Sequence, residues 1–321
     1  MIMGTAVRTL GRVSYSVPAL TRPRRLRPGD TVAIVAPSGP VPEDRLVAGV
    51  DIVRSWGLQV RVGAHVLGRH DDFDYLAGTD VARAEDLQAA WCDPDVSAVL
   101  CARGGYGAQR VIQQLDWDVM ATADPKILVG YSDITALHEA FATRLGVATL
   151  HGPMPSASSF IEDGPTAEHL RATLFEPDAV QKLTGPKAHT ITPGTATGVT
   201  VGGCLALLAA EIGTPTSRSN VAGGILVIED TGEKTYRLDG FLTHLLRAGW
   251  LDGVAGIVLG SWHDCEPVDA LIRDRLVPLG IPIVGELGFG HGSSTTTVPL
   301  GVEATLDADV ATLTLHEPAL M

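Results

Sequence analysis

The sequence predicts an α/β protein with two parts: an N-terminal open parallel sheet of the Rossmann-like kind, and a smaller C-terminal domain of mixed α+β type. In the first half, short β-branched runs alternate with amphipathic stretches, as parallel strands and their crossover helices do. Towards the C-terminus, several short apolar runs follow one another with few helices between them, which is typical of an α+β arrangement.

The first half contains four apolar runs of strand length and three stretches with helical period. We expect strands at 32–36, 58–62, 98–101 and 127–129. We expect helices at about 43–56, 80–92 and 108–115. Glycine-containing turns follow the third and fourth strands, at the carboxyl edge of the sheet where a ligand crevice is expected. These elements define a first domain over residues 27–155.

The segment 156–200 is rich in Pro, Gly, Ser and Thr and has no sustained period, so we expect a linker there. A second domain is expected over residues 201–321. Its predicted helices are 202–212 and 236–248. Its predicted strands are 225–229, 256–260, 281–285, 302–306 and 311–315.

Composition limits the partners of this chain. Its 321 residues are 45% apolar and 19% charged, which is typical of a globular protein with a sizeable core. The net charge of −13 argues against a nucleic-acid partner, because phosphates would be repelled, and favours a small molecule. The four cysteines lie far apart and no histidines cluster at ligand spacing, so we expect no zinc site, no disulfide framework and no cofactor.

Residues 1–26 are predicted to form a flexible, Arg-rich tail. Six arginines and no acid occur in the first 29 residues, but no apolar core of about 7 to 15 residues follows them, so the segment does not qualify as a signal peptide. The longest apolar runs are far shorter than the roughly 18 residues that span a bilayer. We therefore expect a cytoplasmic protein without a membrane partner.

A serine stands where the fourth predicted strand turns into a helix, in Gly130-Tyr131-Ser132-Asp133-Ile134. A serine at such a turn is lifted clear of the sheet, and the N–H groups of the first helical turn face an incoming oxyanion. The pattern is half of a nucleophile elbow, because Ile134 replaces the second glycine of GxSxG. On this segment alone, a helix N-cap is the commoner role for the serine.

A serine nucleophile needs a base within hydrogen-bond reach. His291 is our first choice, because it lies among glycines in Gly-Phe-Gly-His-Gly, where the backbone can present an imidazole at a loop tip. His151, in His-Gly-Pro after an apolar run, is the rival base. His138 is expected to pack within the protein or face solvent, on the helix after the serine.

The base in turn needs a carboxylate that orients it. Glu229 and Asp230 directly follow the strongly apolar run 225–228, so an acid there is placed at the end of a buried strand. We choose Glu229, and Asp230 remains open as the alternative. Glu233 is expected to be a surface or helix-start charge.

A second glycine turn, Arg-Gly-Gly-Tyr-Gly at 103–107, follows the strand predicted at 98–101. Glycines let main-chain N–H groups approach a ligand oxygen closely, so this turn is a candidate oxyanion-hole loop. A dinucleotide-binding loop is the competing interpretation, but the third glycine of GxGxxG is missing, and a Walker A loop is absent too. Arg103 is expected to hold a substrate carboxylate or to pair with an internal acid.

Together these segments resemble the LD-carboxypeptidase family, which comprises muramoyltetrapeptide carboxypeptidases and the related microcin C immunity peptidases. The resemblance runs in order from about residue 27 to the C-terminus and leaves out the Arg-rich tail. Its motifs are Arg-Pro-Gly-Asp at 27–30, Val-Ala-Pro-Ser-Gly at 35–39, Ala-Gly-Thr at 77–79, the glycine turn at 103–107, Gly-Tyr-Ser-Asp at 130–133, Gly-Pro-Met at 152–154, Gly-Gly-Cys-Leu at 202–205, Gly-Thr-Pro at 213–215, Ile-Glu-Asp at 228–230, Gly-Phe-Gly-His at 288–291 and Pro-Leu-Gly at 299–301. So many short motifs in order outweigh the commoner roles given above for single residues.

The resemblance implies a catalytic triad, which the motifs place on Ser132, Glu229 and His291. It also implies an oxyanion hole made by the backbone N–H groups of Gly105 and Asp133. The second domain would supply the acid and the base, and the active site would lie in the cleft between the two domains. The resemblance further implies a homodimer, and no metal is expected.

The matched motifs add four substrate-binding candidates, which are Ser38, Arg103, Gly104 and Tyr106. One departure concerns Cys204, because relatives often carry Asn after the two glycines at 202–203. That departure puts a polar contact near the cleft in doubt and does not affect the triad.

The expected function is that of a serine carboxypeptidase that releases the terminal D-alanine of murein tetrapeptide during peptidoglycan recycling. The alternative is an immunity-type peptidase that cleaves an aminoacyl-nucleotide amide; those relatives stack a purine on an aromatic ring, often Trp, in the connection between domains. The segment 155–201 has Phe160 and Phe175 but no Trp or Tyr, which favours the first function, although Trp250 or Trp262 could serve instead. A non-catalytic binding protein is the third hypothesis, and it is disfavoured because all three triad residue types are present.

Overall fold

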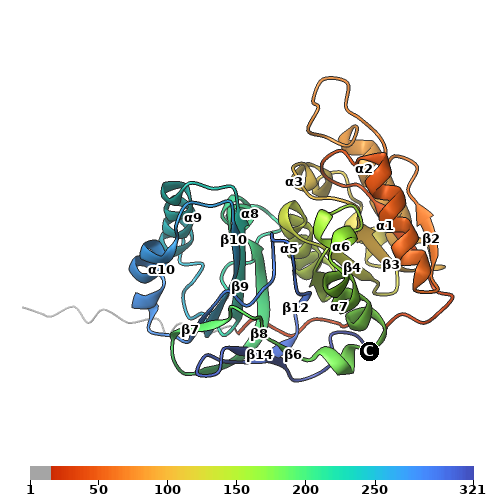
Figure 1. The fold of residues 1–321 in the computed structure, drawn as a ribbon. Helices are drawn as coiled ribbons and strands as arrows, with labels where there is room; N and C mark the ends of the chain where they lie inside the picture. Colours follow the sequence, from red (N-terminus) through yellow and green to blue (C-terminus); the bar gives the residue numbers. More distant parts are fainter. Residues whose placement is uncertain (1–15) are drawn as a thin grey trace, which may run out of the picture.

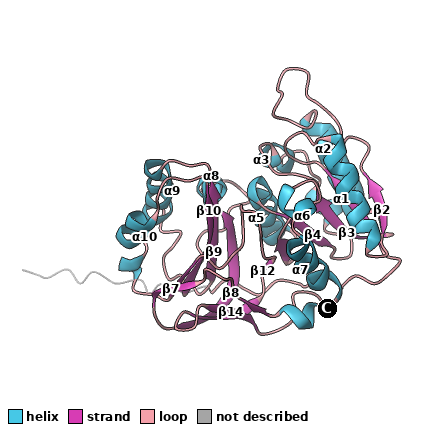
Figure 2. Ribbon diagram, viewed as in Figure 1, coloured by secondary structure: helices cyan, strands magenta, loops and turns pink. Residues whose placement is uncertain are grey.

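Two β-sheets, each covered by helices, form the core of the structure (Figure 1). The computed structural model describes residues 16–321. In Figure 2 the strands of the two sheets stand as separate groups on either side of α5 (Thr135–Arg144). The α/β class and the two-domain architecture are confirmed. Over residues 16–321, no helix has the length and apolar character needed to cross a membrane.

The first sheet combines five strands from the N-terminal half of the chain with one late strand. Its members are β1 (Thr31–Val35), β2 (Gln59–Val62), β3 (Val96–Cys101), β4 (Ile127–Gly130), β5 (Thr149–His151) and β12 (Val298–Leu300). Their order is β12-β5-β4-β3-β1-β2; β1 to β5 are parallel, and β12 runs antiparallel to β5. The carboxyl ends of β1 to β5 therefore meet at one edge, as predicted.

Helices cover both faces of this sheet because their apolar side chains recur on one side. In α1 (Glu43–Ser55) the buried residues Leu46, Val50 and Val53 follow the i, i+4, i+7 spacing of an amphipathic helix and pack in one cluster with Val32 of β1. The opposite face is covered by α2 (Asp80–Cys92), α3 (Ala108–Ile112), α4 (Trp117–Met120) and α5. The helix predicted at 108–115 ends earlier than expected, at residue 112.

The second sheet has a parallel centre and antiparallel flanks. Its strands are β6 (Lys182–Leu183), β7 (His189–Thr192), β8 (Thr195–Cys204), β9 (Ile225–Thr231), β10 (Gly256–His263), β11 (Ile283–Gly285), β13 (Glu303–Asp307) and β14 (Thr312–Leu315). Their order is β6-β14-β13-β8-β9-β10-β11-β7, with β8 to β11 parallel. The crossovers are α8 (Leu205–Glu211), α9 (Thr235–Arg247), α10 (Asp269–Arg275) and η3 (Val277–Leu279). Within residues 16–321, this sheet has eight strands and the first sheet has six.

The interval 156–200, predicted to be a linker, carries regular structure. It contains α6 (Ser158–Glu162), α7 (Gly164–Phe175) and η2 (Pro177–Val180), followed by β6, β7 and the start of β8. Phe160 of α6 and Leu170 of α7 pack in the same apolar cluster as α1, and Figure 1 shows both helices on the first sheet. The Asp-Gly-Pro that resembles a turn is a helix start, because Asp163 accepts a hydrogen bond from the N–H of Thr166.

The described part of the predicted flexible tail, residues 16–26, is held along the surface of both domains. The N–H of Val17 donates to the carbonyl of Ala222 (2.9 Å), and the N–H of Leu26 donates to the carbonyl of Leu174 (2.8 Å). Main-chain pairing of this kind leaves no periodic signal in the sequence, which is why flexibility was expected. The rest of the predicted tail, 1–15, lies outside the described residues.

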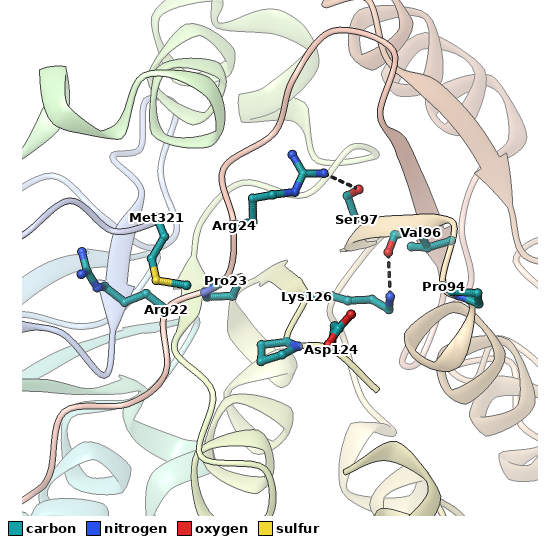
Figure 3. Close-up of a pocket in the computed structure, with 10 residues that line it drawn as sticks. Arg22, Pro23, Arg24, Pro94, Val96, Ser97, Asp124, Lys126 and Met321 are labelled. Atoms are coloured by element: carbon teal, nitrogen blue, oxygen red, sulfur yellow. Dashed lines mark hydrogen bonds between the residues drawn. The ribbon is translucent and has the colours of Figure 1, made fainter. Parts of the chain in front are cut away.

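A pocket of about 320 Å³ lies between this N-terminal segment and the amino ends of β3 and β4 (Figure 3). In it the Nζ of Lys126 donates to the carbonyl of Val96 (2.7 Å), and Arg24 donates to the hydroxyl of Ser97 (3.2 Å). The pocket is thus at the opposite edge of the parallel sheet from the strand ends where a site is expected.

The chain passes between the domains a second time after β11. It leaves the second sheet at residue 285 and adds β12 to the edge of the first sheet, where Val298 is opposite His151. It then returns to the second sheet as β13 and β14. The glycine-rich loop that contains His291 is part of this crossing, so the fold places that histidine where the two domains meet.

Candidate active site

Ser132 is held in a conformation that few non-glycine residues adopt. It directly follows β4 and Tyr131 at the start of η1 (Ser132–Ile134), with φ of +63°. Such left-handed backbone costs on the order of 1–3 kcal/mol and persists only where the surroundings enforce it, as in a nucleophile elbow. Neither η1 nor α5 is capped by a serine side chain, so the N-cap interpretation is not supported in the described chain. A Cβ on Gly130 would lie 2.8 Å from Ile134, so the turn needs glycine there.

The glycine turn after β3 lies directly against this serine. A Cβ built on Gly104 would be 3.0 Å from the Cβ of Ser132 and 3.2 Å from its Oγ, so only glycine leaves the hydroxyl free. Gly105 has φ of +108°, and its chain neighbour Gly104 accepts a hydrogen bond from the N–H of Gly39 (3.0 Å). The loops that follow β1 and β3 are therefore stacked beside the turn after β4.

Asp133 ties these three strand ends together through its side chain. The carboxylate is buried, and its Oδ2 accepts hydrogen bonds from the hydroxyl of Ser38 (2.6 Å) and the N–H of Ala108 (2.8 Å). Burial raises the pKa of Asp133, and the hydrogen bonds oppose that rise. Ser38, predicted to bind substrate, is completely buried, and its hydroxyl is engaged with this carboxylate.

A second brace, Arg83 of α2, was missed from the sequence. Its buried guanidinium donates to the carbonyls of Pro37 and Gly107 and pairs with Asp80, so it joins the loops after β1 and β3. An Asp and an Arg three residues apart on a helix usually indicate a solvated pair. The sequence feature that accompanies this contact is Gly107, because a Cβ at that position would collide with the Arg83 guanidinium.

The carboxylate and the base meet at the end of β9. Glu229 is fully buried, and its Oε2 accepts hydrogen bonds from the Nδ1 of His291 (2.6 Å) and from the backbone N–H of the same residue (3.1 Å). Gly290 permits this approach, because a Cβ there would lie 2.5 Å from Glu229. The His291 side chain is 17% exposed, so the imidazole still reaches open space.

A second imidazole faces the other oxygen of Glu229: the Nε2 of His151 is 3.7 Å from Oε1. Burial opposes ionisation of Glu229, but His151 and His291 outweigh it and lower the pKa to about 2. The alternative acid, Asp230, faces away, towards the start of α8, where it accepts a hydrogen bond from the N–H of Ala206 (2.9 Å). Burial raises the pKa of Asp230 to about 6.

The serine turn and the carboxylate–imidazole pair come together at the domain junction. The ring of Tyr131, the residue before Ser132, lies 4.8 Å from the ring of His291. The N–H of Cys204, at the end of β8, donates to the hydroxyl of Thr135 at the start of α5 (2.9 Å). The nucleophile candidate therefore comes from the first domain, and its acid and base candidates come from the second.

A cavity of about 540 Å³ opens beside His291. Its walls are the loop between β6 and β7, the end of β10 and the loop after β11, and they include Lys187, Trp262, His263, Glu286, Ser293 and Ser294. An aromatic ring, a lysine and several hydroxyls form a polar lining suited to a ligand with both a planar and a charged part.

Two further predicted residues lie at the outer rim of the site. Arg103 is exposed and donates to the carbonyl of Pro40 (2.5 Å), and no internal acid pairs with it in the described chain. Tyr106 is exposed, and its ring lies 5.6 Å from that of Tyr75.

His138 is buried, with its Nε2 2.9 Å from the carbonyl oxygen of Gly130. Residues 16–321 contain no group of three or more His, Cys, Asp or Glu placed to hold a metal ion.

These features define the class of the protein as a two-domain serine peptidase, with a strained serine on one α/β domain and a histidine–glutamate pair on the other. Family models agree: that of the LD-carboxypeptidase N-terminal domain matches residues 32–152, and that of the C-terminal domain matches residues 197–306. The chain belongs to the LD-carboxypeptidase family.

Individual relatives support this assignment. A putative carboxypeptidase of Streptomyces coelicolor is 61% identical over 304 residues, covering 94% of this chain and 98% of the relative. The murein tetrapeptide carboxypeptidase of Pseudomonas aeruginosa is 32% identical over 296 residues, covering 87% and 93%. Among solved structures, MccF in complex with glutamyl sulfamoyl guanosine superposes with a TM-score of 0.83 at 23% identity, covering 95% of this chain and 100% of that one.

Proposed function

We propose that this enzyme is a serine carboxypeptidase that hydrolyses the L,D-peptide bond to the terminal D-alanine of a murein tetrapeptide, as part of peptidoglycan recycling. The observation that carries the proposal is the 2.6 Å hydrogen bond between Glu229 and the Nδ1 of His291, at the junction where Ser132 is held in its left-handed turn. A murein tetrapeptide carboxypeptidase among the relatives supports the substrate.

In the proposed reaction, the Oγ of Ser132 attacks the carbonyl carbon of the scissile bond while the Nε2 of His291 takes the hydroxyl proton. Glu229 keeps the proton on Nδ1 and stabilises the imidazolium. General-base help of this kind contributes roughly 10² to 10⁴ in rate. The N–H groups of Gly105 and Asp133 hold the oxyanion, and each such donor is worth about 10² to 10³ in kcat.

The tetrahedral intermediate then collapses, and the imidazolium of His291 gives its proton to the leaving amine of D-alanine. Water hydrolyses the ester on Ser132 with the same imidazole as base, which returns the enzyme to its starting state. Arg103, the exposed first residue of the glycine turn, is the proposed partner of a substrate carboxylate. Gly104 and Tyr106 would line the same approach, and Ser38 would act only through Asp133.

Mass spectrometry of the purified enzyme with a murein tetrapeptide, beside the Ser132→Ala variant, tests the proposal. Loss of one D-alanine with the wild type and no loss with the variant is the expected result. Full activity of Ser132→Ala would remove this serine from the mechanism. An intact tetrapeptide after prolonged incubation with the wild type would contradict the substrate.

The immunity-type function remains the second candidate, and the cavity beside His291 favours it. Trp262 and Lys187 line this cavity, whose volume of about 540 Å³ could hold a leaving group much larger than alanine. The structural neighbour MccF was solved with glutamyl sulfamoyl guanosine, which supports a nucleotide-like ligand. Incubation with an aminoacyl sulfamoyl adenylate in parallel separates the two: cleavage of this compound alone, lost in Trp262→Ala, would establish the second function.

A cytoplasmic location and a homodimeric state complete the proposal. All four cysteines are free thiols, which fits a reducing compartment. The dimer is supported by the family resemblance alone. Cell fractionation and light scattering of the purified protein test the two statements separately.

A further inference from the structure

His151 is a buried imidazole that the proposed mechanism does not use. It ends β5 of the first domain and is 1% exposed. Its Nε2 lies 3.7 Å from Oε1 of Glu229, which is carried by the second domain. Within residues 16–321, neither ring nitrogen of His151 nor Oε1 of Glu229 has a hydrogen-bond partner.

The surroundings of His151 leave Glu229 as its charged neighbour. The rings of Tyr131, His138 and Phe289 lie 5.9, 6.2 and 5.7 Å from the His151 ring. His138 already has its Nε2 on the carbonyl oxygen of Gly130, and burial lowers its pKa to about 3, which keeps it neutral. Burial raises the pKa of Tyr131 to about 12, so this phenol is neutral as well.

The two oxygens of Glu229 have unequal support from the second domain. Oε2 accepts two hydrogen bonds from His291, through Nδ1 and the backbone N–H. Among the described residues, Oε1 receives none from its own domain, and an unpaired carboxylate oxygen that is fully buried carries a large desolvation penalty. The imidazole that faces Oε1 comes from the opposite domain.

We propose that His151 is a positioning residue for catalysis, which acts through Oε1 of Glu229 and holds this carboxylate between one imidazole from each domain. The proposal rests on the proposed roles of Glu229 and His291. The Nε2 of His151 faces Oε1 at 3.7 Å, so the carboxylate is flanked on both sides and stays aligned with His291. Assembly of the triad then depends on the alignment of β5 with β9, and hence on the packing of the two domains.

This role predicts a change in the pH dependence of kcat/KM that a histidine needed only for core packing would not cause. A carboxylate that loses one of its two imidazoles presents more negative charge to the other, and a nearby negative charge favours the protonated form of an imidazole. Because a protonated base cannot accept the proton of Ser132, the acidic limb of the kcat/KM profile is expected to move to higher pH in such a variant. Loss of core packing alone would lower activity without moving this limb.

The experiment compares His151→Phe, which keeps the ring shape without a donor, with His151→Gln, which keeps an N–H donor. His151→Phe is expected to lower kcat/KM by about 10- to 100-fold near neutral pH and to shift the acidic limb upwards. His151→Gln is expected to restore most of the rate and the wild-type position of the limb. His169→Gln is the matched control, because this histidine of α7 contacts the N–H of Thr297 and not Glu229.

A second readout does not depend on the substrate. The rate at which a fluorophosphonate labels Ser132 reports activation of the serine, and its pH profile should shift in His151→Phe in the same way. If the tetrapeptide is not cleaved by the wild type but labelling shifts, the proposed substrate fails and the role of His151 stands. An unshifted profile in a folded His151→Phe, by labelling or by turnover, would overturn the role of His151.

Discussion

At the scale of single residues, the glycines decide how closely the catalytic groups approach one another. Gly104 leaves the hydroxyl of Ser132 uncovered, and Gly290 lets the His291 loop reach Glu229. In both cases a methyl group would occupy the space that the chemistry needs. The loop that contains His291 offers a test, because an added Cβ would meet a close contact at one of its glycines and not at another.

Gly290→Ala is expected to lower kcat/KM by about 10² or more, because the added Cβ meets the Glu229 side chain at 2.5 Å and φ is +91°. Misplacement of reacting groups by about 1 Å can cost this much. Gly292→Ala in the same loop is the control, since its nearest contact is 3.5 Å and its φ is not positive. Steady-state kinetics on both variants check the prediction, and equal losses would contradict it.

The sequence was sufficient to find the residues of the candidate site, but it was not sufficient to choose between some of them. Spacing predicted glutamate at a strand end and histidine among glycines, and both lie where expected. His291 was preferred to His151 because it lies among glycines, but only the fold shows that the two imidazoles face different oxygens of Glu229. Arg83 was missed because its partners are backbone carbonyls, which carry no residue signature.

At the scale of elements, the strand-end loops of the first sheet are held by a few buried polar groups. Asp133 and Arg83 connect the loops that follow β1 and β3, and Asp133 also belongs to the turn after β4. The position of the serine therefore depends on hydrogen bonds as well as on apolar packing.

Ser38→Ala should lower the free energy of unfolding by about 1.5–3 kcal/mol, because it removes a hydrogen bond to the buried carboxylate of Asp133. Ser156→Ala is the matched control: this serine is also buried, but its hydroxyl has no hydrogen-bond partner in the described chain. Denaturation in urea measures both. A loss for Ser38→Ala no larger than that of the control would show that Asp133 does not depend on this donor.

Element boundaries followed from the sequence where one period extends over several turns. The helix predicted at 43–56 matches α1 because its apolar residues recur on one face. The segment with α6 and α7 was predicted to be a linker because it is rich in Pro, Gly, Ser and Thr, and both helices begin in Ser- or Gly-Pro-containing stretches. The place of β12 in the first sheet could not be foreseen, because strand pairing between distant segments is set by tertiary contacts.

At the scale of the whole molecule, buried titratable groups set the pH dependence of stability. Burial lowers the pKa of His138 from its ordinary value of 6.5 to about 3. Between these values the unfolded chain binds a proton that the folded chain does not, so this residue makes the free energy of unfolding fall as pH falls. The lowered pKa of Glu229 adds a loss between pH 4.5 and about 2. Asp230, with its pKa raised from 3.8 to about 6, acts in the opposite direction between those values.

His138→Gln removes the first of these contributions and keeps an amide N–H for the carbonyl of Gly130. Relative to the wild type, the variant should gain stability as pH falls from 6.5 towards 4, by about 1.4 kcal/mol per pH unit. Unfolding curves of both proteins at several pH values give this difference directly. A difference that does not change with pH would show that His138 takes up its proton equally well in the folded state.

The exchange of segments between the domains bears on how this chain can be divided. The strand β12 completes the edge of the first sheet from far along the chain, while Val17 pairs with the second domain before the first domain begins. A fragment that ends at residue 155 would present β5 as an open edge, ready to pair with another copy. A cut in the exposed stretch near residue 187 would instead leave two pieces that remain paired through β12 and through Val17. The border between the domains in the sequence is therefore not a place where the two domains can be separated.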